Sequence, residues 1–179
     1  MTRTAARLIR TARDADLGLR RIANQTGLSI GALPNGGVFA IEHRHEGGLT
    51  MVNQVLGSAL QGSIARLYLR AHAPARLLAQ AVGPGAKVGF GAADDRFAWQ
   101  GETGGLRHRA VLWLHPRHHV WLWRLEVANA REVEVTCDAI LVQDVGLAAR
   151  GSLMINEAYA SQYVDHHVAE HPDLGPVVM

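Results

Sequence analysis

The alternation of apolar and polar residues between positions 107 and 143 constrains the fold of this chain more than any other feature. Three runs, at 109–115, 120–128 and 132–143, place apolar side chains on every second residue, the period of a β-strand with one buried face. Turn-forming residues, Pro-Arg-His-His and Asn-Ala-Arg, separate the runs. We therefore expect a three-stranded antiparallel meander packed on one side, as in a β-sandwich.

Shorter strand signals precede the meander. They lie at 28–33, 38–43, 64–71, 87–90 and 97–100. The first two flank Pro-Asn-Gly-Gly, a strong turn signal, and so predict a hairpin. The last two flank an Asp-Asp turn. Together these signals predict a mostly β chain folded as an antiparallel β-sandwich over residues 25–179.

Residues 1–24 differ from the rest because they contain six arginines and only two aspartates. Their apolar residues between positions 5 and 23 loosely follow helical spacing, which predicts a short basic N-terminal helix or linker. A basic helix can contact nucleic acid. Because no aromatic residues interleave with these arginines as stacking platforms, we expect a solvated helix and no nucleic-acid partner.

The apolar runs, the N-terminus and the cysteine count indicate which cellular compartment to expect. No run of eighteen apolar residues occurs, so no membrane span is expected. The N-terminus lacks the apolar stretch of a secretory signal. Cys137 is the single cysteine, which fits a reducing compartment, and its place in a strand predicts a small buried thiol. We therefore expect a cytoplasmic protein.

Five short blocks carry a resemblance to a known family. They are Gly-Leu-Thr-Met-Val-Asn at 48–53, Ala-Arg-Leu-Tyr-Leu-Arg at 65–70, Val-Gln-Asp-Val-Gly-Leu-Ala at 142–148, Asn-Glu-Ala-Tyr at 156–159 and Ser-Gln-Tyr-Val-Asp-His-His at 161–167. Residues 25–179 resemble the N-terminal β-supersandwich domain of the cellobiose-phosphorylase-type glycoside phosphorylases. The resemblance is closer to the branch of cyclic β-1,2-glucan synthases and β-1,2-oligoglucan phosphorylases.

The resemblance implies a fold, and it also implies that the catalytic domain is missing from this sequence. Enzymes of this family carry their general-acid aspartate and phosphate-binding residues on an (α/α)6 barrel after the sandwich, and this sequence contains no such barrel. The resemblance therefore implies the accessory β-sandwich of a glycosyltransferase or glycoside phosphorylase, truncated at its C-terminal end, which shapes a sugar cleft and a domain or subunit interface. We expect no catalysis by this chain alone, no cofactor, and an open strand edge that supports a homodimer or docking of the catalytic domain.

The candidate site residues lie mainly in the last two blocks. Sugars present apolar C–H faces and hydroxyl groups, so aromatic rings next to amides and carboxylates suit them. The residues predicted to bind a β-glucan oligosaccharide or to dock against the catalytic domain are Asn156, Glu157, Tyr159, Gln162, Tyr163, Asp165, His166, His167 and Trp99. No pair of carboxylates can be assigned as opposed acid and base, so no catalytic residue is predicted.

Eight of the ten histidines fall into three groups, at 43–45, 115–119 and 166–171. His43 and His45 would share one face of a strand, as two ligands of one metal ion can. They flank Arg44 and precede Glu46, a pattern typical of an exposed turn, and no metal site is predicted. A histidine-based, metal-dependent sandwich enzyme is the second alternative function, and it requires the histidine groups to converge in space.

A free-standing carbohydrate-binding module is the first alternative. Such a module should expose a tryptophan or tyrosine platform on one sheet face. An accessory domain should instead bury Trp113, Trp121 and Trp123 of the meander and expose an apolar edge near its C-terminus. The two hypotheses therefore differ in where the aromatic residues lie.

Overall fold

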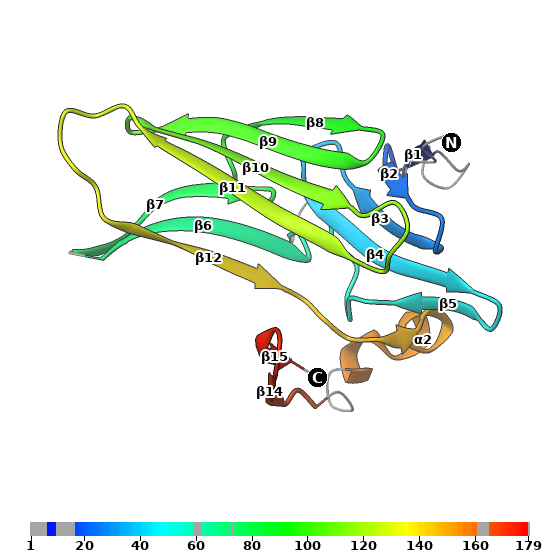
Figure 1. Ribbon diagram of the computed structural model, residues 1–179. Helices are drawn as coiled ribbons and strands as arrows, with labels where there is room; N and C mark the ends of the chain where they lie inside the picture. The colour runs from blue at the N-terminus through cyan, green and yellow to red at the C-terminus, as the bar shows by residue number, and fades with distance from the viewer. Residues whose placement is uncertain (1–6, 10–16, 59–61, 73, 161–164, 179) are drawn as a thin grey trace.

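The computed structural model describes residues 7–9, 17–58, 62–72, 74–160 and 165–178, and these are mostly β-strand (Figure 1). The elements in chain order are β1 (Arg7–Ile9), β2 (Arg20–Ala23), β3 (Leu28–Ala32), β4 (Val38–His45), β5 (Gly48–Met51), β6 (Ala65–His72), β7 (Ala75–Val82), β8 (Gly89–Ala93), β9 (Arg96–Thr103), β10 (Leu106–Leu114), β11 (Trp121–Asn129), β12 (Cys137–Gln143), β13 (Ala148–Ala149), α2 (Arg150–Ala160), β14 (Val168–His171) and β15 (Gly175–Val178). The predicted β class is confirmed.

The strands form a sandwich of antiparallel sheets. A four-stranded sheet, β11-β10-β9-β8, lies above a six-stranded sheet, β1-β2-β3-β4-β5-β13, and a three-stranded sheet, β12-β6-β7 (Figure 1). One buried apolar cluster draws on all three sheets, with Ile30, Leu67 and Leu112 among its members. The core therefore lies between the layers, as expected when each sheet has one apolar face.

The predicted hairpin between residues 28 and 43 is confirmed. β3 and β4 pair antiparallel across the Pro-Asn-Gly-Gly turn. Leu33 N–H donates to the Gly37 carbonyl at 2.8 Å and closes the turn. Gly36 has a φ of +80°, a left-handed conformation that glycine adopts without steric cost.

The predicted third strand of the meander is placed differently. β12 does not join β11; it crosses between the layers and pairs with β6, with Leu141 opposite Leu67. Residues 130–136 form the connection, and Val133 on it is exposed. Alternation identifies which face of a strand is buried but is the same whichever neighbour the strand pairs with, so the crossover could not be predicted from it. Cys137, at the start of β12, is half-buried rather than buried.

The described parts of the predicted N-terminal helix are not helical, and residues 1–6 and 10–16 lie outside the described residues. β1 and β2 are strands, and Ile22 in β2 lies opposite Ile30 of β3. Leu19 and Ile22 are buried in the sandwich. At residues 20–23, pairing with β3 overrides the loose helical spacing, because a weak local propensity cannot oppose it. Within the described ranges, no helix is long and apolar enough to cross a membrane.

The tryptophans of the meander help to join the layers. Trp121 and Trp123 on β11 are partly buried against the core. Their indole N–H groups both donate to Oε1 of Gln143 on β12, at 3.4 and 3.3 Å. The expected packing of these rings against the sandwich is therefore observed.

A buried histidine should make the stability of the sandwich depend on pH. His108 on β10 is 2% exposed, and neither of its ring nitrogens has a hydrogen-bond partner among the described residues. Desolvation lowers the pKa of its imidazole below the ordinary value of 6.5. Below that pH the unfolded chain therefore binds a proton that the folded chain does not, and the free energy of unfolding should fall.

Urea denaturation at pH 7.5 and pH 5.5 would measure this loss of stability. His108→Leu should lose less stability than the wild type between these two pH values, because the variant has no imidazole to protonate. His171→Leu, at an exposed position of β14, is the matched control and should behave like the wild type. Equal pH dependence in the wild type and His108→Leu would contradict the prediction.

Candidate functional site

The helix that carries three of the predicted site residues is anchored on the six-stranded sheet. α2 follows β13, which pairs with β5. Leu153 on α2 is buried against Ala40 and Met51. The Asp144 carboxylate accepts hydrogen bonds from the backbone N–H groups of Gln54 and Val55, at 2.7 and 2.9 Å, and holds the approach to β13 against the loop after β5. The start of α2 is thus fixed by both apolar and polar contacts.

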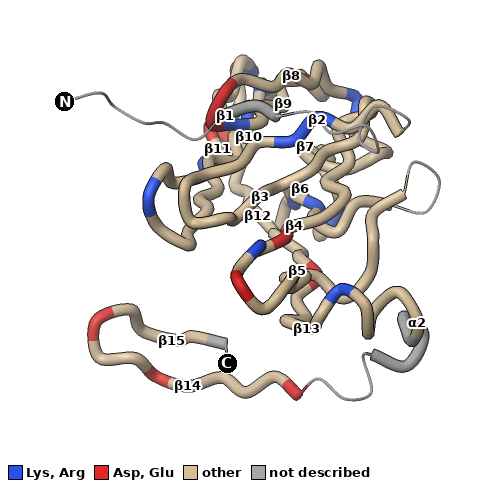
Figure 2. Tube along the Cα trace, turned by 90° about the vertical axis from the view of Figure 1, so that its right-hand side faces the viewer, with Lys and Arg blue, Asp and Glu red and all other residues tan. Residues whose placement is uncertain are grey.

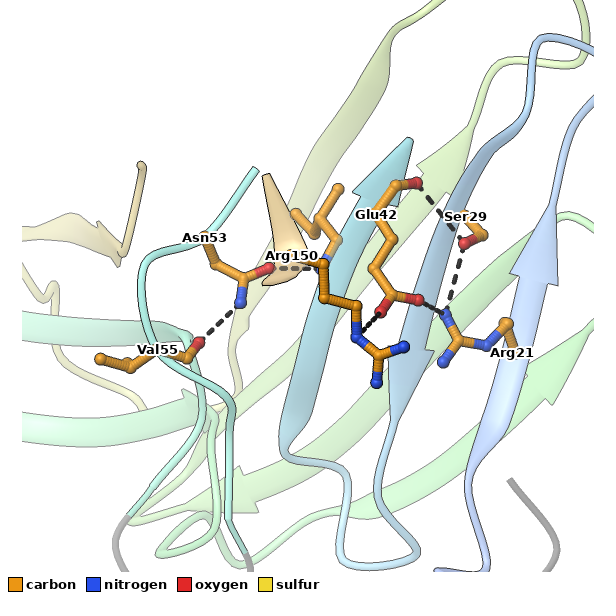
Figure 3. A network of polar contacts seen from close by, with 7 residues as sticks. Arg21, Ser29, Glu42, Asn53, Val55 and Arg150 are labelled. Atoms are coloured by element: carbon orange, nitrogen blue, oxygen red, sulfur yellow. Dashed lines mark hydrogen bonds and ion pairs between the residues drawn. The ribbon is translucent and has the colours of Figure 1, made fainter. Parts of the chain in front are cut away.

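A buried ion network ties the same helix to β2 and β4 (Figure 3). The guanidinium of Arg21 forms an ion pair with the Glu42 carboxylate and also donates to Ser29 Oγ at 3.3 Å. Arg150, the first residue of α2, places Nε 3.9 Å from the other oxygen of Glu42. Glu42 therefore lies between two guanidinium groups, which compensates the cost of burying its charge.

Asn53 supports this network from the adjoining loop (Figure 3). Its Oδ1 accepts the backbone N–H of Ile41 at 2.7 Å, and its Nδ2 donates to the Val55 carbonyl at 2.6 Å. Asn53 is fully buried. A polar side chain in such a position is satisfied by backbone groups, as buried polar groups generally must be. Its role here is to hold the loop after β5 against β4.

The predicted site residues near the C-terminus are only partly described. The backbone places Asn156, Glu157 and Tyr159 on α2. Gln162 and Tyr163 lie outside the described residues. The remaining three, Asp165, His166 and His167, are exposed on the segment before β14.

Asp165 and His167 are the members of this group that the structure brings together. Asp165 Oδ2 lies 2.9 Å from Nε2 of His167. Both side chains are strongly exposed, so water screens the pair and it contributes little to stability. Surface exposure also leaves both groups available to a partner.

Trp99 does not occupy the position expected of a sugar-binding residue. Its side chain is 0% exposed, and its indole N–H donates to the Gly36 carbonyl at 2.8 Å. Its ring packs against Phe90, Phe97 and Trp123, with centroids 5.4, 6.3 and 5.6 Å away. The polar neighbours Gln100, Glu102 and Thr103 suggested an exposed ring, but the strand alternation points Trp99 into the core. No face of the ring is available to a ligand.

The histidines converge in a way that the sequence groups did not suggest. Nε2 of His43 lies 3.0 Å from Nε2 of His119, which belongs to a different group in the sequence. The rings of His43 and His45 stack at 5.5 Å. Across the described ranges, no group of three or more histidine, cysteine or acidic side chains is placed to hold one metal ion. Pairing residues 43 and 119 requires knowing that the β10–β11 turn lies beside β4, which follows only from the topology.

Five large apolar side chains are exposed on the described elements and loops after β12. We define the C-terminal apolar surface by its exposed members: Leu147, Met154, Ile155, Val168 and Leu174. Ile155 is 82% and Val168 is 74% exposed. An apolar edge near the C-terminus is what the accessory-domain hypothesis required. Surfaces of this kind mark interaction sites when they are concentrated in one region.

Two further features accompany this surface. Leu147 has a φ of +69°, the left-handed region that residues other than glycine rarely adopt, at a cost on the order of 1 kcal/mol. Figure 2 shows the β14–β15 hairpin set apart from the sheets. Residues 165–178 contain three acidic residues and no lysine or arginine. The hairpin therefore presents apolar and acidic side chains without packing on the sandwich.

Comparison with known proteins finds a matching family model and a related protein. The sequence model of the family described as SOGP N-terminal domain matches residues 31–179. Over 121 residues the chain is 31% identical to a protein of Listeria innocua serovar 6a named 1,2-beta-oligoglucan phosphorylase. The matched stretch is 67% of this chain but 10% of that protein. The chain therefore spans about a tenth of the length of this relative.

Proposed function

The chain belongs to the SOGP N-terminal domain family, and from this premise we propose that it is the accessory β-sandwich domain of a carbohydrate-active enzyme, a β-glucan phosphorylase or a cyclic glucan synthase. In this role it shapes the sugar cleft and docks against a catalytic domain, which the family resemblance implies is an (α/α)6 barrel. The named function of the Listeria relative supports a β-1,2-linked glucan as the substrate of the parent enzyme.

The observation that carries the proposal is the C-terminal apolar surface. Single exposed apolar residues are normal on any protein. Here five large ones fall between residues 147 and 174, on α2 and on segments that have few contacts with the sandwich. Burial of each such side chain contributes about 1.5–3 kcal/mol, which is enough for these five to stabilise a domain interface. The acidic hairpin next to them favours a partner surface with basic residues.

The alternatives receive less support. Among the described aromatic side chains, no tryptophan, phenylalanine or tyrosine is exposed as a platform for a sugar ring. A free-standing carbohydrate-binding module would need such a platform. The two carboxylates of an independent glycosidase should face each other about 5–10 Å apart across a cleft. Asp165, the one predicted acidic site residue whose side chain is described, lies on the surface in a pair with His167.

A chimeric enzyme tests the docking role. This chain would replace the matching segment of the Listeria phosphorylase, with and without the pair of substitutions Ile155→Asp and Leu174→Asp. The parent chimera should fold and degrade β-1,2-glucan oligosaccharides. The two aspartates should reduce its activity at least about tenfold, which corresponds to about 1.4 kcal/mol of lost interface energy, because burying a carboxylate is costly. Phosphorolysis rates would measure the effect.

Leu77→Asp is the matched control. Leu77 is also exposed, but it lies on β7 at the other edge of the three-stranded sheet. This variant should keep the activity of the parent chimera. Equal activity of the Ile155→Asp/Leu174→Asp chimera and its parent would contradict docking through this surface.

For the isolated chain, we expect the same surface to support a homodimer. The two aspartates should disrupt this homodimer, which light scattering would show. Tight binding of the isolated chain to a β-1,2-glucan oligosaccharide in calorimetry would favour the module instead.

A further inference from the structure

One asparagine clamps together two turns from opposite layers of the sandwich. Asn24 lies in the turn between β2 and β3. Its Nδ2 donates to the carbonyls of His115 and His118 in the β10–β11 turn, at 2.7 and 2.9 Å. Its Oδ1 accepts hydrogen bonds from Thr26 N and Leu28 N, at 3.0 and 3.1 Å. Together with the backbone hydrogen bond from Gln25 N–H to the Pro116 carbonyl at 3.2 Å, this side chain holds the two turns against each other.

The clamp brings three electronegative atoms together. His43 Nε2 on β4 lies 3.0 Å from the Thr26 carbonyl oxygen and 3.0 Å from Nε2 of His119 in the β10–β11 turn. A carbonyl can only accept, so the proton of this contact resides on His43 Nε2. Nε2 of His119 must then face the same proton as a second acceptor. The single Nε2–H of His43 therefore faces two acceptors, the Thr26 carbonyl oxygen and His119 Nε2.

The spacing of the two nitrogens suits a metal ion in place of that hydrogen. Imidazole nitrogens bind first-row metals at about 2.0–2.1 Å. Two such ligands lie about 3.0 Å apart when the angle at the metal is about 94°, which matches the cis positions of a tetragonal site rather than a tetrahedral one. From this arrangement we propose that His43 and His119 form a binding site for a divalent late transition metal, Cu²⁺ or Ni²⁺.

The surroundings support this class of metal. The site has two imidazoles and the Thr26 carbonyl, and imidazole favours copper and nickel over magnesium or calcium, which prefer all-oxygen sites. His119 is exposed and His43 is half-buried, so the ion can enter from solvent and water can complete its coordination. Asn24 acts as a positioning residue, because it holds Thr26 and the turn of His119 without facing the ion itself.

His45 is not a ligand of this site, although it shares a strand face with His43. Its Nε2 lies 3.0 Å from Thr50 Oγ1, and its Nδ1 accepts the backbone N–H of Gly47 at 3.1 Å. Both ring nitrogens are therefore engaged at the tip of the β4–β5 hairpin. His45 is therefore a control. It distinguishes a site formed by His43 and His119 from one formed by His43 and His45, the pair that sequence spacing suggested.

The test uses the tag-free chain at pH 7.5, titrated with Cu²⁺ and monitored by calorimetry and electron paramagnetic resonance. One ion per chain should bind with splitting from two imidazole nitrogens. His119→Gln, at an exposed turn position, should weaken binding by more than the roughly 10–100-fold cost of removing a supporting residue around a metal site. Asn24→Ala should weaken binding within that range, and His45→Gln should leave it unchanged. Circular dichroism and melting temperatures would show that each variant is folded.

Three results would overturn the proposal. One is a signal from a single nitrogen in the wild type. Another is unchanged affinity in His119→Gln. The third is an equal loss in His45→Gln and His43→Gln, which would place the ion between the two β4 histidines. Failure of this titration would leave the accessory-domain role untouched, because none of the docking substitutions lies in the two clamped turns.

Discussion

Replacing Glu42 with alanine is expected to lower the free energy of unfolding by about 3–5 kcal/mol, because it leaves a buried positive charge without its carboxylate. Arg21 and Glu42 are only 9% and 7% exposed, so water cannot replace the lost partner. Arg150 loses the same carboxylate, and with it the ionic contact between α2 and β4. Urea denaturation of Glu42→Ala against the wild type would measure the cost.

Two further variants separate the broken pair from the loss of a side chain. The double substitution Arg21→Met and Glu42→Leu removes both charges and keeps the volume, so its stability should be close to that of the wild type. Arg150→Ala should cost less than Glu42→Ala, because the arginine is partly exposed and 3.9 Å from the carboxylate. A cost below about 1 kcal/mol for Glu42→Ala, the range of an exposed pair, would show that the network is solvated.

Replacing Trp99 with alanine should also destabilise the protein by about 3–5 kcal/mol, the range for deletion of a large buried aromatic side chain. The ring fills the space between Gly36, Phe90, Phe97 and Trp123 and connects the two layers. Alanine would leave a cavity there and an unpaired carbonyl on Gly36. Chemical denaturation at pH 7.5 would measure the loss.

Trp113→Ala is the matched control for Trp99→Ala. Trp113 is half-buried and donates its indole N–H to Asp95 at 2.8 Å. Its removal should cost roughly 1–2 kcal/mol, the value of a hydrogen bond and partial burial. Similar costs for the two variants would contradict the assignment of Trp99 to the core.

The β class was predictable because alternation and turns are local signals. The Pro-Asn-Gly-Gly turn and the strands around it were located from fewer than twenty residues, and β3 and β4 pair as expected. The partner of β12 was not predictable, because its alternation fits pairing with β11 as well as with β6. The two strands before residue 24 were missed for a related reason: three or four residues carry too little periodicity to distinguish strand from helix.

The candidate site was less predictable than the fold. The composition of residues 156–167 drew attention to the C-terminal segment, but the exposed apolar residues there, Ile155 and Val168, flank the predicted block rather than belong to it. Trp99 was judged by polar neighbours in sequence, of which Gln100 and Glu102 point to the opposite face of the strand. The contact of His43 with His119 joins residues 76 positions apart through the clamp at Asn24. Such a contact depends on the arrangement of turns in three dimensions.

The crossover of β12 has a consequence for synthesis on the ribosome. β6 ends at His72, and its outer neighbour β12 begins at Cys137, about 65 residues later. At about 5–20 residues per second, translation takes about 3–13 s to supply them. During that interval the β6–β7 hairpin has an unpaired edge, which other nascent chains on the same message can pair with. The yield of folded protein should therefore depend on how quickly the ribosome translates the codons between β6 and β12, which include those of the four-stranded sheet.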